Sequence, residues 1–196
     1  RAIRLCFAEK ELFLTQLRAA LRASAYGPLQ IMFPMVGSLE DIRKAKEYLN
    51  LAKEQLKERK QQFDEQIRIG IMIEIPAIAL IADLAAEEVD FASIGSNDLT
   101  QYLSAADRMN PEVAAYYKSD STAMLRLLGF VFREFSKREK EISVCGEMAG
   151  NPETAQLLVG LGARKLSMSS GNIAGVKAKL AECTLQELTA LAEKKL

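Results

Sequence analysis

The sequence predicts an α/β fold in which helices cover a parallel β-sheet. Five short apolar segments of strand length alternate with helical segments, and these strand segments are continuously apolar rather than alternating with polar residues. Ligands in such folds gather at the carboxyl ends of the strands. The expected strand ends carry the unusual residues of the chain, which are Phe33, Glu74, Ser96, Cys145 and Met168. A doubly wound sheet and a (β/α) barrel both satisfy these observations.

The first part of the chain is predicted to contain a helix and then a strand. Residues 1–6 are apolar apart from two arginines and fit either a strand or the start of a helix. Residues 8–25 form a helix with a leucine face, and Gly27 follows it as a stop signal. Residues 29–33 form a buried strand that ends at Pro34.

A long helix is expected next, followed by two strands. Ser38 and Asp41 form a capping pattern, and one apolar stripe at alternating spacings of three and four comes after them. Strands are predicted over 67–73 and 89–94. An alanine-rich helical segment that begins at Pro76 lies between these strands and carries the chain back, so that they run parallel.

The last third of the chain repeats the same alternation, and capping residues mark its helices. The expected elements are a helix capped by Asp120 or Ser121, a strand over 142–145, a helix from Asn151 to 159, a strand over 165–168, a helix over 173–181 and a helix from Thr184 onward.

Composition narrows the function. The chain has 196 residues, 49% of them hydrophobic, which is enough for one domain over residues 1–196. Twenty-six basic and twenty-six acidic residues cancel, so the net charge indicates neither nucleic acid nor an anionic membrane surface as a partner. The longest apolar run and the absence of a leader predict no membrane insertion and a soluble protein.

The side-chain inventory restricts the chemistry. Cys6, Cys145 and Cys183 show no CxxC spacing, which fits a reducing cytoplasm. The chain has no histidine, so the commonest general base and metal ligand is missing. Any chemistry must therefore use carboxylates, arginines, a thiol or backbone groups.

Two acidic residues at neighbouring strand ends suggest a metal site. Glu74 and Asp98 each follow an apolar strand. Alone, each is also explained as an acid in the first turn of a helix, and Asn97 as a helix cap. Together, two carboxylates leave coordination positions free for water and a substrate phosphate, which is the habit of Mg²⁺.

Arg108 and Cys145 extend this candidate site. Arg108 offers a guanidinium fork for a phosphate or carboxylate, although pairing with Asp107 at the surface explains it equally. Cys145 ends a strand before a glycine bend that would expose its thiol, although a lone cysteine in such a strand is also a small buried hydrophobe. Arg1 is a surface charge by default.

Several motifs in order resemble one known family. They are RAIR at residue 1, IMFPM at residue 31, EIPA at residue 74, IGSNDLTQY at residue 94, DRMN at residue 107, VCGEMAG at residue 144 and KLSMSS at residue 165. This set is similar to the phosphoenolpyruvate-binding domain of Enzyme I of the bacterial sugar phosphotransferase system, the phosphoenolpyruvate-protein phosphotransferases. The order and spacing hold across essentially the whole chain.

The resemblance implies a fold and a parent activity. The expected fold is a (β/α)8 TIM barrel, of which this chain holds about the last five strand-helix units as a partial domain. The implied reaction is Mg²⁺-dependent transfer of phosphate from phosphoenolpyruvate to a histidine on an absent domain, which releases pyruvate. That histidine would pass the phosphate to a histidine-containing phosphocarrier protein for sugar uptake. A cytoplasmic homodimer is implied as well.

The resemblance also implies residue roles. Glu74 and Asp98 match the Mg²⁺ ligands, with Asp98 at the substrate as well. Cys145 matches the acid that protonates the enolate carbon. The residues that match the contacts to the substrate phosphate are Arg1, Asn97 and Arg108.

Two departures and three other hypotheses accompany this resemblance. Ile75 stands where the family usually has Thr, and Met109 where it often has Gly. Pyruvate phosphate dikinase and phosphoenolpyruvate synthase share the Glu, Asn-Asp and Cys pattern, although the CGEMAG context favours Enzyme I. An Mg²⁺-dependent enolate aldolase also uses Glu and Asp about one β-α unit apart. An inactive barrel fragment that serves folding or dimerisation is the non-enzymatic hypothesis, because an open barrel exposes two sheet edges.

Overall fold

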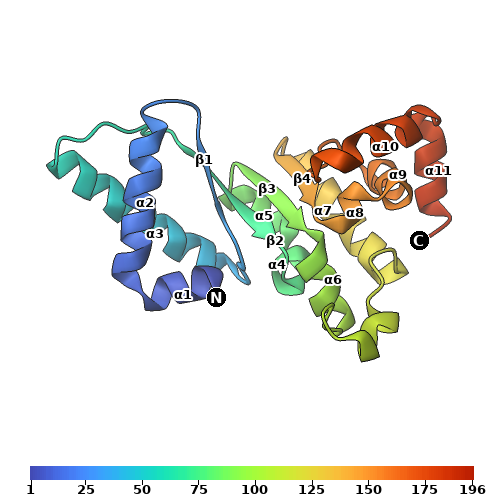
Figure 1. Cartoon of the computed structure of the whole chain (residues 1–196). Helices are drawn as coiled ribbons and strands as arrows, with labels where there is room; N and C mark the ends of the chain where they lie inside the picture. Colours follow the sequence, from blue (N-terminus) through green and yellow to red (C-terminus); the bar gives the residue numbers. More distant parts are fainter.

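A computed structural model describes residues 1–196 and contains one four-stranded parallel sheet (Figure 1). Each strand pairs with the next strand along the chain, in the order β1-β2-β3-β4. The strands are β1 (Gln30–Phe33), β2 (Arg68–Ile73), β3 (Phe91–Gly95) and β4 (Glu141–Cys145). A connection through a helix separates each pair, as parallel strands require.

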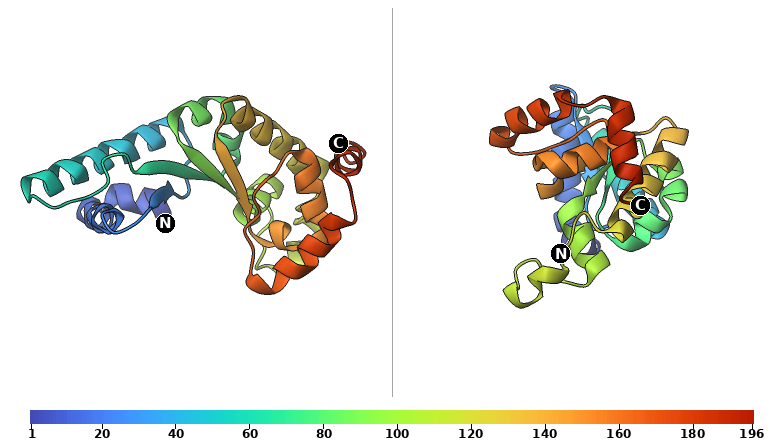
Figure 2. Two further views of the ribbon diagram at one scale, coloured as in Figure 1. Left: turned by 90° about the horizontal axis from the view of Figure 1, so that it is seen from above. Right: turned by 90° about the vertical axis from the view of Figure 1, so that its right-hand side faces the viewer.

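Helices line the outer side of this sheet. Seen from above, α3 (Leu39–Glu58), α5 (Ala82–Glu88) and α7 (Thr122–Lys137) follow one another along the outside of an arc, with the strands within it (Figure 2). The remaining helices are α1 (Ala2–Ala8), α2 (Lys10–Ser24), α4 (Pro76–Leu80), α6 (Ser96–Ser104), η1 (Pro111–Tyr116), α8 (Glu147–Gly150), α9 (Pro152–Leu161), α10 (Ser170–Ala181) and α11 (Leu185–Glu193).

The two faces of the sheet differ in chemistry. Side chains such as Ile73, Ile94 and Val144 are fully buried in the hydrophobic core between the strands and the helices. Their neighbours along each strand point to the opposite face, because side chains alternate along a strand. That inner face is lined by a set that includes Met72 and Ser143 around an open cavity of about 530 Å³. The expectation of continuously apolar strands was therefore wrong, since only the outer face is uniformly apolar.

The predicted fifth strand is also reduced. Residues 165–168 form only an isolated parallel bridge between Val144 and Leu166. The Val144 N–H donates to the Lys165 carbonyl at 3.0 Å, and the Ser167 N–H donates to the Val144 carbonyl at 2.8 Å. A segment paired on one side only has little to extend its ladder. The chain therefore holds five strand-helix units, in the fifth of which the strand is reduced to this bridge before α10.

Several helix predictions are confirmed and two are adjusted. Ser38, Ser121 and Asn151 cap α3, α7 and α9 through side-chain oxygens, and Thr184 forms a full capping box with Glu187. Residues 2–6 belong to helix α1 rather than to a strand, and Arg1 precedes its first turn. The alanine-rich segment is interrupted at Ile81, which separates α4 from α5.

The arrangement is that of a partial (β/α) barrel. Its strands are all parallel and consecutive, and helices follow the outside of the arc (Figure 2). The concave inside is an open cavity lined by side chains of the strands. A doubly wound sheet would place helices on both faces. No helix combines the length and the apolar composition that a membrane span needs. The carboxyl ends of all four strands meet at one edge of the sheet.

Candidate active site

Glu74 lies at the end of β2 and is nearly enclosed. Its exposed fraction is 6%, and its Oε1 accepts a hydrogen bond from the backbone N–H of Met35 at 2.7 Å. Burial raises the pKa of the Glu74 carboxyl, the Met35 N–H opposes that rise, and the neighbouring charge of Asp98 adds to it. A cation beside Glu74 would offset this unfavourable burial of charge.

Met35 reaches Glu74 only because its backbone is unusual. It follows β1 after Pro34 and has a φ of +57°, the left-handed region that side chains other than glycine rarely adopt. Its side chain is buried in the core. The core and the hydrogen bond together hold the strained conformation.

Asp98 lies in the first turn of α6 and attracts two arginines from distant parts of the chain. Its Oδ2 is 3.5 Å from Arg1 Nη2, and its Oδ1 is 3.9 Å from Arg108 Nη1. Its side chain is 16% exposed. Arg108 does not pair with Asp107, whose Oδ1 instead accepts from the Met109 N–H at 2.9 Å. Two guanidinium groups therefore converge on the edge of the sheet where an anion would bind.

Asn97 is fixed at both its side chain and its backbone. Its Oδ1 accepts from the Glu147 N–H at 3.0 Å, and its backbone carbonyl accepts from the Tyr117 hydroxyl at 3.1 Å. These bonds leave the side-chain NH₂ as a free donor. Asn97 and Cys145 both line an adjoining cavity of about 380 Å³.

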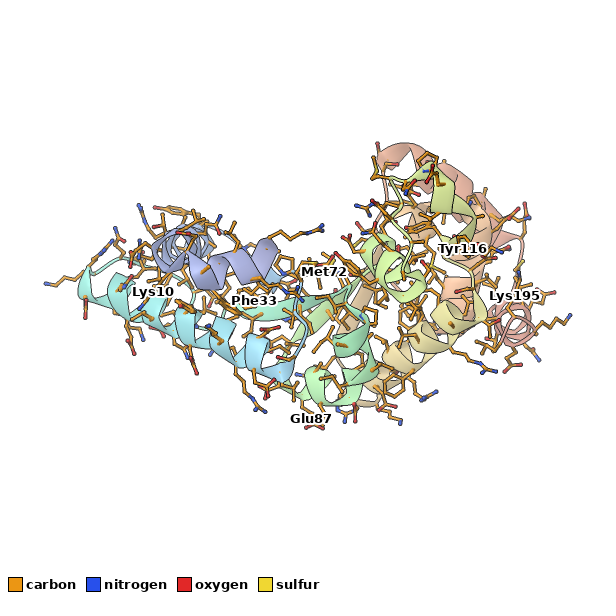
Figure 3. The ribbon with its side chains drawn as sticks, turned by 90° about the horizontal axis from the view of Figure 1, so that it is seen from below. Lys10, Phe33, Met72, Glu87, Tyr116 and Lys195 are labelled. Atoms are coloured by element: carbon orange, nitrogen blue, oxygen red, sulfur yellow. The ribbon has the colours of Figure 1, made fainter.

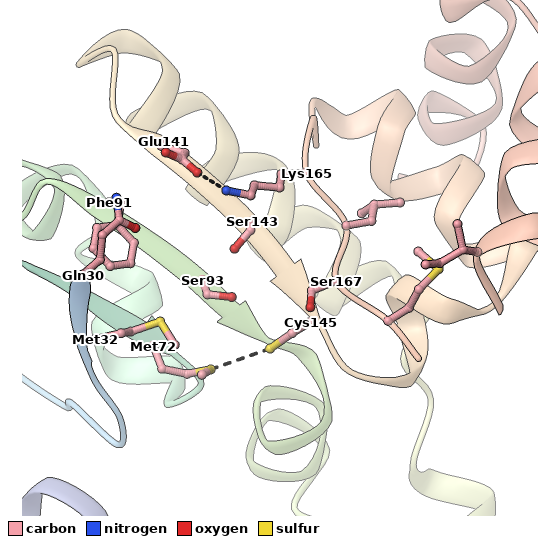
Figure 4. A pocket seen from close by; sticks show the side chains of 13 residues that line it. Gln30, Met32, Met72, Phe91, Ser93, Glu141, Ser143, Cys145, Lys165 and Ser167 are labelled. Carbon is pink, nitrogen blue, oxygen red and sulfur yellow. Dashed lines mark hydrogen bonds and ion pairs between the residues drawn. The ribbon is translucent and has the colours of Figure 1, made fainter. Parts of the chain in front are cut away.

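Cys145 ends β4 beside Gly95 of β3, so its thiol comes from the strand next to the one that leads to Asp98. Its Sγ lies 3.4 Å from the Ile94 carbonyl and 3.8 Å from Met72 Sδ (Figure 4). The residue is half-buried and borders both cavities. The thiol therefore lies at the cavity wall and not within the hydrophobic core.

Two glycines allow this close arrangement. A Cβ on Gly95 would lie 2.9 Å from Glu74 Oε2 and from Met72 Sδ. A Cβ on Gly146, which has a φ of +101°, would lie 2.8 Å from Asn97 Oδ1. Real Cβ contacts almost never fall below 3.0 Å. The carboxylate and the amide can approach their neighbours only because these positions lack side chains.

The donor set fits a magnesium ion. The structure contains no group of three or more histidine, cysteine or acidic residues that could hold a metal. Mg²⁺, however, is usually held by one or two carboxylates, with waters and phosphate oxygens in the other positions. Glu74 and Asp98, which interact electrostatically across the ends of β2 and β3, provide such a pair.

The two departures from the expected motifs lie in different surroundings. Ile75 precedes α4 and gives that helix no side-chain cap, a role that a hydroxyl there could have filled. Met109 is 81% exposed and packs against nothing in the core.

Sequence reasoning missed three residues at this site. Met35 and Met72 resemble ordinary core residues, and nothing in their type indicates a hydrogen bond to Glu74 or a sulfur contact with Cys145. Tyr117 lies 20 residues after Asn97 and is half-buried beside it. Burial and then the nearby charge of Glu147 raise the pKa of the Tyr117 hydroxyl. Only the fold brings these residues to the site.

Comparisons with known proteins agree with the motifs. Residues 1–185 match the family described as PEP-utilising enzyme, PEP-binding domain. Phosphoenolpyruvate-protein phosphotransferase of Listeria monocytogenes is 47% identical over 196 residues, which cover the whole chain and 34% of the relative. The proteins of the same name from Bacillus subtilis and Staphylococcus aureus are each 46% identical over 194 residues, covering 99% of the chain and 34% of each relative. The chain thus spans about a third of the length of these curated relatives.

Two solved structures share the fold at low identity. A citrate lyase from Burkholderia xenovorans aligns with a TM-score of 0.60 and 16% identity, over 93% of this chain and 60% of that one. A malate synthase from Haloferax volcanii aligns with a TM-score of 0.54 and 19% identity, over 83% of this chain and 49% of that one. At these identities the likeness concerns the fold alone, and it agrees with a partial barrel.

Proposed function

Because the chain belongs to the family of PEP-binding domains of PEP-utilising enzymes, we propose that it is the phosphoenolpyruvate-binding part of a phosphoenolpyruvate-protein phosphotransferase. The relatives of that name, 46–47% identical over nearly the whole chain, support this choice over a dikinase, a synthase or an aldolase. The observation that carries the proposal is the convergence of two carboxylates, two arginines and a thiol at one edge of the sheet.

The proposed reaction divides into two events. The bond between phosphorus and the enol oxygen of phosphoenolpyruvate breaks, and a bond to a histidine nitrogen outside this chain forms. The electron pair stays on the enol oxygen and gives the enolate of pyruvate. A proton from the Cys145 thiol then reaches the methylene carbon and yields pyruvate, and the thiolate regains a proton from water.

Each part of the site has a role in these events. Glu74 and Asp98 would hold Mg²⁺, which supplies positive charge at the oxygens where negative charge develops. Arg1 and Arg108 would turn from Asp98 to the phosphate once the metal takes over the charge of Asp98, because guanidinium groups match phosphate oxygens. The free NH₂ of Asn97 would donate to the same phosphate.

Cys145 is suited to the proton transfer. Its Sγ is close to one backbone carbonyl and one thioether, both of which can accept a hydrogen bond from the thiol and so hold it at the cavity wall. A thiol also replaces the histidine that the chain lacks as a general acid. It borders the same cavity as Asn97, so a substrate held by Asn97 would lie beside it.

The remainder of the parent protein belongs to the same proposal. The phosphorylated histidine and the site for a histidine-containing phosphocarrier protein would lie outside residues 1–196, which form part of one barrel domain. The parent would be a cytoplasmic homodimer that serves sugar uptake. The inactive-fragment hypothesis instead predicts that residues 1–196 serve folding or dimerisation and bind substrate weakly or not at all.

Titration calorimetry tests the binding half of the proposal. The 196-residue chain should bind phosphoenolpyruvate in the presence of Mg²⁺ and much more weakly in its absence, because the phosphate completes the metal coordination. Substituting Ca²⁺, which prefers more ligands and longer distances, should weaken the binding. Equal affinity with and without a divalent ion would contradict the metal role of the two carboxylates. No binding under either condition would support the inactive fragment.

Exchange of the pyruvate methyl hydrogens in D₂O tests the proton donor. The chain with Mg²⁺ should catalyse this exchange, and Cys145→Ala should slow it at least about 100-fold, the usual contribution of a positioned acid or base. Cys183→Ala is a matched control, because that thiol accepts a hydrogen bond from Gln156 and lines neither cavity at the site. Unchanged exchange in Cys145→Ala would remove Cys145 from the mechanism.

A further inference from the structure

We propose that Tyr117 is a positioning residue, whose hydroxyl anchors the segment carrying Arg108 to the helix carrying Asn97 and Asp98. This segment, residues 105–117, is called the Arg108 segment below. The inference rests on the proposed function, because it assigns to Tyr117 the placement of a guanidinium at the phosphate position. It adds a residue that neither the motifs nor the carboxylate pair indicate.

The Arg108 segment leaves α6 and returns to the start of the same helix. It begins at Ala105, which ends α6 in the left-handed conformation with a φ of +50°. The Arg108 N–H donates to Gln101 Oε1 at 3.2 Å, near the end of α6. The Tyr117 hydroxyl donates to the Asn97 carbonyl at 3.1 Å, in the first turn of α6. The segment is therefore tied to one helix at both of that helix's ends.

Little else holds the segment. The short helix η1 within it has no buried residue. Met109 is 81% exposed and Tyr116 is 70% exposed, and of the whole segment only Ala106 is buried. The N–H groups of Ala105 and Ala106 donate to the Gln101 carbonyl where the segment leaves α6, and its other hydrogen bonds, such as the Asn110 cap of η1, are internal. Segments with few buried contacts open locally at low free energy, so a single anchoring bond has a large influence on their placement.

The two adjacent tyrosines have different surroundings, which makes the anchor testable. Tyr117 is half-buried, its hydroxyl donates to the Asn97 carbonyl, and the charged groups that act on it are those of Glu147, Arg108 and Asp98. Tyr116 projects from the neighbouring position and donates no hydrogen bond (Figure 3). Of these two consecutive tyrosines, only Tyr117 therefore anchors the segment to Asn97.

Loss of the anchor should move Arg108 rather than the metal ligands. Arg108 Nη1 is already 3.9 Å from Asp98 Oδ1, a separation that leaves it free to move. Asp98 belongs to α6 itself, so freeing the segment leaves its position unchanged. Tyr117→Phe should therefore weaken phosphoenolpyruvate binding about tenfold, the equivalent of one hydrogen bond, and leave the binding of Mg²⁺ alone unaffected.

Two measurements on the 196-residue chain test this inference. Hydrogen exchange without ligand should show residues 106–117 exchanging at least about fivefold faster in Tyr117→Phe, because the opening free energy of the segment falls. Tyr116→Phe is the matched control and should leave both exchange and affinity unchanged. Unchanged exchange in Tyr117→Phe would overturn the anchor. A wild-type chain that binds no phosphoenolpyruvate would instead overturn the proposed function, while the exchange result still decides the anchor.

A double-mutant cycle separates positioning from a general structural effect. If Tyr117 acts through Arg108, its substitution by Phe should have no further effect on affinity in an Arg108→Gln background. Independent losses that multiply in the double variant would overturn the proposed route through Arg108. Near-identical thermal unfolding of the single variants would show that the fold is retained.

Discussion

The two ends of the parallel sheet treat their charges in opposite ways. At the amino end, Glu141 pairs with Lys165 of the bridge segment (Figure 4). Its Oε2 also lies 3.6 Å from Arg68 Nη1. Arg68 in turn lies over the ring of Phe91. At the carboxyl end, Glu74 is buried and accepts one backbone hydrogen bond but forms no ion pair, while two arginines lie beside Asp98.

This difference indicates that the charged residues at the amino end serve stability and those at the carboxyl end serve function. Ion pairs at the surface contribute modestly to folding stability, and their charges are already balanced without a ligand. Burying an ionised carboxylate next to a second one lowers the stability of the fold unless a bound cation offsets the charge. Residues at the amino ends of barrel strands commonly serve stability, and those at the carboxyl ends serve ligands. Substitutions at the two ends should therefore differ in which property they change.

The largest effect is expected for Glu74→Gln. Mg²⁺-dependent binding of phosphoenolpyruvate should fall at least about 100-fold, since even outer-shell changes at metal sites reach that range. The free energy of unfolding without metal should rise by about 1 kcal/mol, because glutamine still accepts from the Met35 N–H and carries no buried charge. Calorimetry and urea denaturation measure the two quantities.

The stabilising effect of Glu74→Gln should depend on pH. The pKa of Glu74 is raised in the folded chain, so its contribution is most favourable below its ordinary value of 4.5 and is lost as the pH rises through the raised pKa. The advantage of Glu74→Gln should therefore disappear in acid. Glu54→Gln, an exposed position on α3, is the matched control. A Glu74→Gln chain that is less stable at neutral pH would contradict the comparison between the two ends.

Gly95→Ala should produce an intermediate effect. The added methyl group would lie 2.9 Å from Glu74 Oε2 and Met72 Sδ, so the chain should lose about 2 kcal/mol of unfolding free energy by overpacking. Gly175→Ala is the control, because that position in α10 has open space around it and alanine favours a helix. The midpoint of thermal unfolding should be lower than wild type for Gly95→Ala and should not be lower for Gly175→Ala.

Glu141→Gln should produce the smallest effect and no change in ligand binding. Its side chain is 39% exposed, so screening by solvent limits the loss of stability to about 0.5 kcal/mol at neutral pH. Lys165 and then Arg68 lower the pKa of Glu141, so its contribution is present above its ordinary value of 4.5 and is lost as the pH falls through the lowered pKa. In urea denaturation, the unfolding free energies of the wild-type and Glu141→Gln chains should differ at neutral pH and become equal in acid. A loss of phosphoenolpyruvate affinity in Glu141→Gln would contradict the assignment of the amino end to stability and the carboxyl end to ligand binding.

Much of the fold was predictable because local signals agreed with tertiary structure. Capping residues such as Ser38 and Asn151 mark helix starts that the structure confirms. The fifth strand was not predictable from its apolar residues, because whether 165–168 extends a ladder depends on a neighbour beyond it. The polar inner face was visible in Ser93 and Ser143, yet these small residues were outweighed by the apolar ones around them.

The candidate site divides in the same way. The proximity of Glu74 and Asp98 follows from strand order, which the sequence indicated. The pairing of Asp98 with Arg1 does not, since 97 residues separate them and only the packing of α1 beside the sheet brings them together. Backbone donors such as the Met35 N–H have no residue signature at all.

The donor at Met35 has a consequence for how this position can vary. A backbone amide cannot be removed by changing a side chain, so the hydrogen bond to Glu74 persists in any variant that keeps the φ of +57°. Glycine and asparagine adopt that region readily, whereas β-branched residues do not. Variants at this position should therefore be limited both by backbone preference and by loss of the buried side chain. The dihedral angle is constrained here as well as the side chain.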